Sequence, residues 1–309
     1  GMRIVLSGTD SLGFLFTEDE QLYDRCILLH TTFIPYREFE SVLGIHGIDE
    51  YIRYGGTMSL GGVHLGGVHY NESSTFASKE RADEYVDTAI AHNIQHSLRC
   101  YQYEDHFRNL RDLYDKNELT SAINRVVKDI NHRFTLEVLT QDFKSHDLGV
   151  SANNLRRDRS NPIDILDHID LSAVTDRLRD LLEILNKSEQ TVVLDEDHAA
   201  EIKEYLDLLD LTRDIDIRHL PKVNTKSTRT VIAQPGLRYA QASALIHSLL
   251  LDETFSALSL PERTAVQERI LTEIKGRMLE DIVLLETKIA NPGKKVFVLQ
   301  FPIGEFDMV

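Results

Sequence analysis

The sequence predicts a mainly helical chain with short β-hairpins and a winged helix-turn-helix at its centre. Three observations carry this prediction. Apolar residues recur at helical spacing over much of 78–290. A helix, a tight turn with glycine and a second helix follow one another over 118–157. A polar loop at 221–227 then separates two extended stretches, as the two strands of a wing require.

Composition sets the broad class of the protein. The 309 residues are 42% hydrophobic and 27% charged, which is typical of a globular protein with two or three small domains. The net charge of −16 argues against a general nucleic-acid coat or a membrane-surface binder, but it leaves room for one basic patch. No apolar run approaches the roughly 18–20 residues of a spanning helix, so no membrane partner is expected. Two distant cysteines, Cys26 and Cys100, favour a cytoplasmic location.

The first 70 residues mix a strand with short helices. The apolar run 3–6 ends at the polar turn 7–11, as a strand buried in a parallel sheet does. Pro35 is placed as the first residue of a helix that ends at Gly44. Residues 55–70 are rich in glycine and contain Gly-Gly-Val-His twice in succession.

Helices dominate from residue 78 onward. Residues 78–114 predict one or two helices, with one apolar face that contains Tyr85, Ala89, Ile90, Ile94 and Leu98. The helix-turn-helix comprises helices at 118–133 and 134–139, a turn at 147–151 and a further helix that contains 155–157. The wing consists of an extended stretch after Leu208 and a strand at 230–233. Helices at 240–251 and 261–290 and strands at 296–299 and 306–309 complete the prediction.

Several short motifs occur in an order that resembles a known family. Ile4–Ser11 is similar to the strand that ends in a polar sensor in archaeal-type AAA (P-loop) ATPases, a family that is also common in bacteria. In that family an arginine comes after the sensor strand, and Leu22–Arg25 resembles it. A Pro-x-x-x-x-Glu-Phe helix comes next in the family, and Ile34–Phe39 resembles that helix. In that family a winged helix and a restriction-endonuclease-like domain come next. Gln234–Arg238 resembles the element after the wing, and Gly276–Glu280 the start of the nuclease-like helix.

The resemblance implies that the chain corresponds to the part of such an ATPase after the Walker motifs. The Gly-x-x-x-x-Gly-Lys-Ser/Thr loop would lie before Met2, and the closing strand of the nuclease-like domain after Val309. The implied units are the end of the ATPase core (1–70), a helical lid (71–115), the winged helix (116–238) and the start of the nuclease-like domain (239–309).

The resemblance also implies roles for individual residues. Ser7 and Thr9 would sense the γ-phosphate, and Arg25 would act as an arginine finger, since its guanidinium stabilises charge on phosphoryl oxygens. The alternative for Arg25 is a surface ion pair with Asp24 or Glu20. ATP and magnesium are therefore expected in the full-length parent, and no cofactor in this chain alone.

Three segments mimic a nucleotide or metal site. Asn291–Lys295 contains Gly-Lys but follows a helix instead of opening one, so it is not a phosphate-binding loop. Val192–Glu196 is like a magnesium-binding strand, but we predict that Asp195 caps a helix. His64 and His69 lie on the glycine-rich repeat, which favours a loop over a metal site.

A second metal hypothesis concerns the C-terminal end of the chain. The nuclease-like resemblance, which includes Glu305–Asp307, implies that Glu280 and Asp307 form half of a divalent-ion site. The alternative is that Glu280 is a solvated helix residue and that Asp307 lies at the frayed end of a strand. The open sheet edge also predicts self-association through the C-terminal strands.

The helix-turn-helix is locally basic. Residues 124–159 hold seven Lys and Arg against five Asp and Glu, a net +2 in a chain of −16. Arg156, Arg157 and Arg159 lie on the candidate recognition helix, and Lys222, Lys226 and Arg229 flank the wing. These positions predict weak phosphate contacts with duplex DNA. The alternative is a winged helix that only packs or contacts protein.

The sequence thus predicts part of an AAA-type ATP-binding protein that is not catalytically competent alone. Its parent would remodel nucleic acid or a partner protein, or act in defence. A stand-alone winged-helix DNA-binding regulator and an inactive interaction scaffold are the alternatives.

Overall fold

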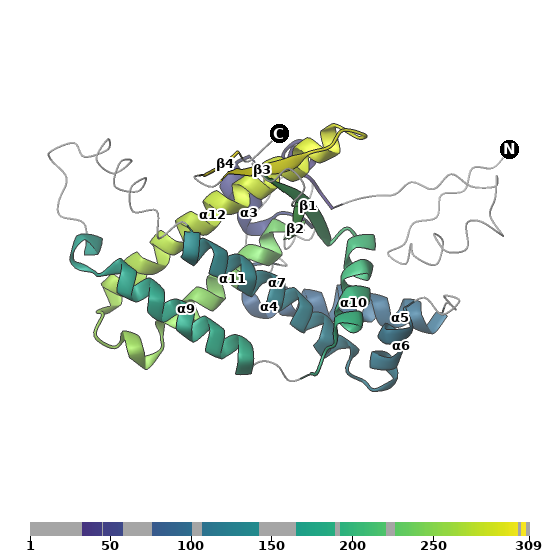
Figure 1. Cartoon of the computed structure of the whole chain (residues 1–309), viewed down its shortest axis with the longest axis horizontal. Helices are drawn as coiled ribbons and strands as arrows, with labels where there is room; N and C mark the ends of the chain where they lie inside the picture. The colour runs from purple at the N-terminus through teal and green to yellow at the C-terminus, as the bar shows by residue number, and fades with distance from the viewer. Residues whose placement is uncertain are drawn as a thin grey trace.

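A computed structural model describes residues 33–44, 46–57, 76–100, 107–141, 165–188, 192–220, 226–301 and 304–306. The described part of the chain is mainly helical, with one small sheet at its upper edge (Figure 1). This confirms the predicted fold class at the level of a mainly α chain with short β-hairpins.

Helices account for most of the described elements. In chain order they are α2 (Tyr36–Leu43), α3 (Ile48–Tyr54), α4 (Lys79–Tyr85), the π-helical segment η1 (Val86–His92), α5 (Asn93–Cys100), α6 (Arg108–Asp115), α7 (Leu119–Gln141), the 3-10 turn η2 (Ile165–His168), α9 (Leu171–Ser188), α10 (Glu196–Leu208), α11 (Pro235–Leu250), the 3-10 turn η3 (Glu253–Phe255) and α12 (Leu260–Ala290). The strands are β1 (Thr212–His219), β2 (Lys226–Ile232), β3 (Phe297–Phe301) and β4 (Gly304–Phe306).

Local capping signals set several helix ends. Gly44 ends α2 with a left-handed backbone, φ 68°, as its sequence position predicted. The side chain of Asp195 caps α10 by accepting the backbone N–H of His198, which confirms its prediction as a helix cap. Ser259 and Glu262 form a reciprocal capping box at the start of α12.

The helices α4, η1 and α5 follow one another without a break. Five of their buried residues recur every four positions: Ala82, Val86, Ile90, Ile94 and Leu98. Ala91 and Ser97 are buried beside this row. Four residues of an α-helix turn through about 400°, so such a face would drift by about 40° at each step. The wider turns of η1 offset this drift. Ala89, which was expected on the buried face, is exposed because the π segment changes the helical register.

The predicted break before Phe134 is wrong, because α7 continues through it as one helix of 23 residues. Its first half packs into one hydrophobic core through residues such as Leu119 and Ile123. Its second half packs into another through Phe134 and Val138. The predicted turn at 147–151 and the helix beyond it lie outside the described residues.

The sheet has the strand order β2-β1-β3-β4. β1 and β2 form the antiparallel hairpin that was predicted as a wing, and Thr212 pairs with Ile232 at its base. β3 pairs with β1 in parallel, and β4 turns back antiparallel to β3. The hairpin is therefore joined through β1 to strands from the C-terminal end of the chain.

Helix α11 lies among the other helices, and eleven of its sixteen residues are buried. It contacts α3, α4, α7, α9, α12 and β2. Gly236 near its start lies so close to Phe76 and Gly55 that an added Cβ would overlap the Phe76 ring. The Gly236 N–H donates to the Gly55 carbonyl at 3.1 Å. These contacts explain why glycine occurs at 236.

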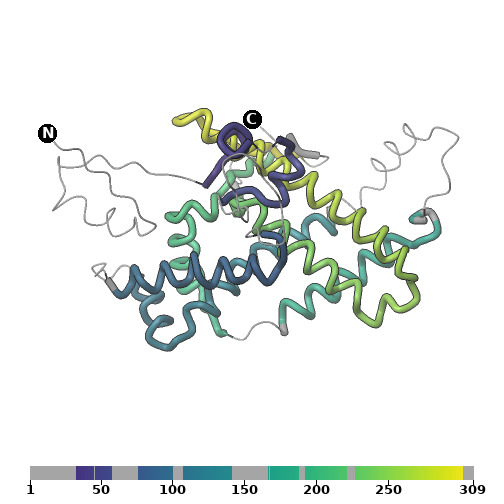
Figure 2. Tube along the Cα trace, turned by 180° about the vertical axis from the view of Figure 1, so that it is seen from behind, coloured from purple at the N-terminus to yellow at the C-terminus, as the bar shows by residue number. Residues whose placement is uncertain are grey.

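Segments from the two ends of the described chain lie side by side. The purple segment of α2 and α3 lies beside the yellow α12 in both views (Figures 1 and 2). The Tyr36 backbone N–H donates to Glu286 Oε1 at 2.7 Å, across 250 positions of sequence. The predicted boundary between 238 and 239 falls within α11.

Candidate functional site

Most of the predicted site residues lie outside the described residues. These are Ser7, Thr9 and Arg25 of the nucleotide hypothesis, Arg156, Arg157, Arg159 and Lys222 of the DNA hypothesis, and Asp307 of the metal hypothesis. The backbone of Lys226 begins β2. Only Glu280 and Arg229 have described side chains, and the structure does not bring these two together. The predicted phosphate contact of Arg229 at the wing is wrong, because its side chain is 10% exposed and pairs with Asp281.

Glu280 lies on α12 and is half-buried. Its carboxylate pairs with the guanidinium of Arg277, one turn earlier on the same helix. This pair favours the interpretation of Glu280 as a structural helix residue. No group of three or more histidine, cysteine, aspartate or glutamate side chains able to hold a metal ion occurs among the described residues.

The next residue along the chain, Asp281, has a different environment. Its side chain is 3% exposed and lies between two arginines. Arg229 of β2 donates from Nη2 to Oδ1 at 2.6 Å, and Arg238 of α11 donates from Nη1 to Oδ2 at 2.6 Å. Short N–H···O bonds between charged groups are roughly twice as strong as neutral ones. Asp281 therefore connects a strand and two helices at one buried point.

An aromatic ring completes this cluster. The Arg238 guanidinium lies 4.1 Å from the centre of the Phe134 ring of α7, within the range of a cation–π interaction. Burial lowers the pKa of Arg238, the Asp281 charge opposes that effect, and the positive charge of Arg229 adds to it. Sequence reasoning assigned Arg229 to the wing and missed the cluster, because Asp281 lies 43 positions from Arg238 and 52 positions from Arg229.

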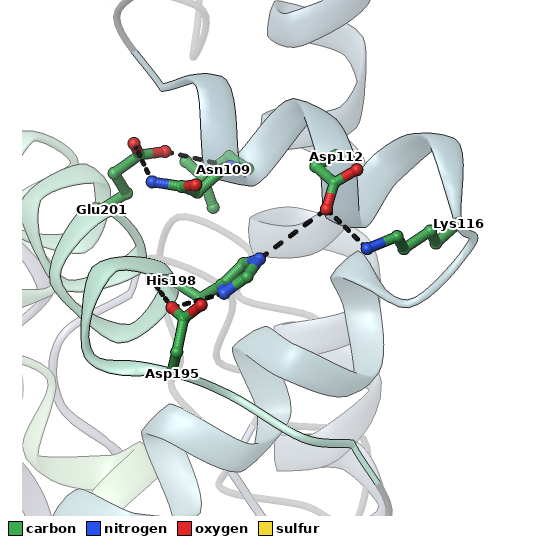
Figure 3. Close-up of polar contacts among 7 residues, drawn as sticks. Asn109, Asp112, Lys116, Asp195, His198 and Glu201 are labelled. Atoms are coloured by element: carbon green, nitrogen blue, oxygen red, sulfur yellow. Dashed lines mark hydrogen bonds and ion pairs between the residues drawn. The ribbon is translucent and has the colours of Figure 1, made fainter.

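A second polar cluster joins α6 to α10 (Figure 3). His198 Nδ1 lies 2.6 Å from Oδ1 of Asp195, and its Nε2 lies 4.0 Å from Oδ2 of Asp112. Lys116 donates to the same Asp112 oxygen at 2.6 Å. The His198 ring therefore lies between carboxylates of two different helices.

Glu201 of α10 supports the same contact. One of its oxygens accepts the side-chain amide of Asn109 at 2.7 Å, and the other accepts the backbone N–H of Leu110 at 3.0 Å (Figure 3). Phe107, the residue before α6, makes no side-chain cap. Glu201 thus supplies a carboxylate to the start of α6, where backbone N–H groups lack partners within the helix.

The surface formed by α10 is acidic. Residues 195–208 contain a single lysine, Lys203, and no arginine. The six acidic residues of this range are Asp195, Glu196, Asp197, Glu201, Glu204 and Asp207. Beside them Val193 is 92% exposed. Because nucleic-acid backbones are anionic, this surface is unsuited to phosphate contacts.

An open groove of about 360 Å³ lies between the end of α3, the start of α4 and α11. Arg53 and Lys79 line it together with small residues of α11. Arg53 Nε lies 3.1 Å from Asp49, and Lys79 Nζ lies 2.7 Å from Asp83. Since both cations are paired with carboxylates, they give the groove no preference for an anionic ligand.

Within the described ranges, no helix has both the length and the apolar character that crossing a membrane requires. The chain matches no protein-family model, no curated protein and no solved structure.

Proposed function

We propose that this chain is part of an AAA-type ATP-binding protein, that it does not turn over ATP alone, and that it contacts a partner protein in the parent. The ATPase part of this proposal rests on the order of short motifs in the sequence. The partner part rests on the charge of α10.

The element order supports the proposal. The helices α6, α7 and α10 followed by the hairpin β1–β2 have the helix-helix-helix-strand-strand order of a winged helix, with α9 inserted. α10 contacts both α6 and α7, and all three share one hydrophobic core with the ends of the hairpin. The long helix α12 and the strands β3 and β4 then follow, in the order that the family resemblance implies for a nuclease-like domain.

The observation that carries the partner role is the acidic character of the helix directly before the hairpin. The sequence placed the recognition helix at 155–157, which lies outside the described residues. Among the described elements, the helix directly before the hairpin holds the position of the helix that enters the major groove in a winged helix that reads DNA. Here that helix is α10, which holds five carboxylates and one lysine and is preceded by the carboxylate of its cap, Asp195. Carboxylates on this face would repel phosphates and attract basic groups of a protein. A protein partner with basic side chains therefore fits the surface better than duplex DNA does.

Fluorescence anisotropy with labelled duplex DNA at low salt tests this assignment. We expect no salt-dependent binding. If DNA bound through Arg156, Arg157 and Lys226, three neutralised phosphates would give a log–log salt slope of about −2.7. Binding with such a slope, lost when these three residues are changed to alanine, would favour the DNA-binding regulator and overturn the proposal.

The ATPase part has a separate test. The genomic DNA directly before the codon of Met2 should contain an in-frame Gly-x-x-x-x-Gly-Lys-Ser/Thr motif within about 250 codons, the upper length of one domain. The absence of this motif would refute the proposal that the chain is part of an AAA-type ATPase. The purified chain should show no ATP turnover with Mg²⁺, and turnover that disappears in Arg25→Ala would contradict the statement that it is inactive alone.

A further inference from the structure

Strand β2 forms one edge of the sheet, because the strand order is β2-β1-β3-β4. The Ala233 N–H donates to the carbonyl of Leu211, and this bond continues the register of β1 and β2. Backbone groups alternate in direction along an antiparallel pair, so every second residue counted from Ala233 faces β1. Lys226, Thr228 and Thr230 therefore direct their backbone N–H and C=O groups away from β1.

This edge is open within the part of the chain that the structure describes. The outward groups of the three residues make no backbone hydrogen bond to another described residue. Ser227 and Thr228 are exposed, whereas Ile232 at the other end of β2 is buried in a core. Residues 226–230 contain no proline, and their unbroken register with β1 excludes a bulge. Neither of these common devices therefore protects the edge from pairing with another strand.

An exposed carboxylate lies on the sheet face beside this edge. Asp216 of β1 is opposite Thr228 in the register, and no ion pair joins it to another described residue. Arg218 lies on the same face, but its guanidinium is 3.9 Å from the ring centre of Phe297 in β3, on the other side of β1 from β2. Asp216 is therefore accessible to a cation that approaches from the β2 edge.

We propose that an extended segment of a partner protein, with basic side chains, pairs antiparallel with β2 along 226–230. Its backbone satisfies the outward N–H and C=O groups, as in β-augmentation. The residue opposite Thr228 directs its side chain to the same face as Asp216, which lies two strands away, at roughly 9–10 Å. An extended lysine side chain spans most of this distance. This inference rests on the partner role proposed above and specifies how the partner binds.

Charge favours a basic partner over a second copy of the chain. Each copy has a net charge of −16, so two copies repel one another, whereas a basic segment is attracted. The acidic helix α10 packs beside the same hairpin, since Lys203 donates to Asp214 of β1 at 2.7 Å. A basic segment that leaves the β2 edge therefore remains in a region of negative charge.

Fluorescence anisotropy with two synthetic peptides tests the inference on the wild-type chain. The first peptide is a labelled octamer that alternates valine and lysine. The second has the same sequence with a methyl group on the backbone nitrogen of each lysine, which keeps the charge and removes the N–H groups that face β2. We expect the first peptide to bind, and the second to bind more weakly by about tenfold or more, because several backbone hydrogen bonds are lost. Equal binding of both peptides would overturn the edge inference and leave the attraction of basic groups intact. Binding of neither peptide at low salt would contradict both the edge inference and the basic partner.

Two substitutions of Thr228 locate the site. Thr228→Pro removes the outward N–H, and proline is tolerated on an edge strand whose N–H faces solvent. Thr228→Ala keeps this N–H. We expect Thr228→Pro to weaken binding of the first peptide by about tenfold, and Thr228→Ala to change it by less than about twofold. Equal binding by the two variants would overturn the inference. The peptide comparison needs only the wild-type chain, so it decides the question even where Thr228→Pro does not fold.

Two further measurements identify the chemistry of the occupant. Asp216→Asn should weaken binding of the first peptide by about 1.5- to 5-fold, as expected for an exposed ion pair. Glu253→Gln removes the same charge from an exposed position outside the sheet and should have no such effect; equal effects would overturn the role of Asp216. In light scattering, a wild-type dimer that disappears in Thr228→Pro would identify a second copy of the chain as the occupant and overturn the partner assignment.

Discussion

The strongest prediction concerns Asp281→Asn, because this substitution removes the only negative charge between two buried cations. The new amide directs one N–H group at a guanidinium, so one of the two 2.6 Å bonds is replaced by a contact between donors. Breaking a buried ion pair by removing one partner typically costs about 3–5 kcal/mol. At about 2–4 °C per kcal/mol, this lowers the melting temperature by roughly 6–20 °C.

Glu280→Gln is the matched control, since it makes the same chemical change at the adjacent position of the same helix. Its pair with Arg277 is a half-buried pair within one helix, worth about 0.3–0.5 kcal/mol. Equilibrium urea unfolding followed by far-ultraviolet circular dichroism measures both variants, since the chain has no tryptophan. A loss of stability in Asp281→Asn no larger than in Glu280→Gln would refute the reasoning.

A triple variant separates the ion pairs from the space that they fill. Replacing Arg229, Asp281 and Arg238 together by Met, Leu and Met removes every charge and keeps the volume similar. Apolar replacement of a whole buried ionic cluster is often neutral or stabilising. We therefore expect the triple variant to be more stable than Asp281→Asn. A triple variant less stable than the single one would show that packing, not unpaired charge, causes the loss.

Three further predictions follow from single contacts. Burial raises the pKa of Glu286, so the folded state loses stability relative to the unfolded state as this carboxyl group ionises. Glutamine at this position stays neutral and can still accept the Tyr36 N–H. The free energy of unfolding of Glu286→Gln, measured in urea, should therefore increase relative to wild type as pH rises from about 4 to 7. The hydrogen bonds that Asp195 accepts as a helix cap lower its pKa. At pH 7 Asp195→Ala should therefore lower the free energy of unfolding more than Glu196→Ala does. This difference should vanish as pH falls below the pKa of Asp195 in the folded protein. Light scattering should show concentration-dependent association that weakens when residues 296–309, which include β3 and β4, are removed; an unchanged mass would exclude association through these strands.

Local features of the fold could be predicted from the sequence. Asp195 was predicted as a helix cap, and Gly44 as a helix end, because capping depends on residues within one turn. The hairpin of β1 and β2 was predicted from two extended stretches around a polar loop. The single helix α7 was predicted as two, because its apolar face meets two different cores, and sequence periodicity does not show which core each residue joins.

The candidate sites also fall into two groups, those that the sequence predicted and the one that only the tertiary structure identified. Residue types and motif order by themselves placed Glu280 in a metal hypothesis and Arg156 in a DNA hypothesis, since both depend on neighbours in sequence. Only the tertiary structure identified Asp281, because a buried ion pair depends on which elements meet in space, and Arg229 and Asp281 lie 52 positions apart. The parallel pairing of β3 with β1 is another long-range result, set by how α11 and α12 return the chain to the sheet. The sequence thus determined the caps, the hairpin and most helices, whereas packing decided which charges are buried together.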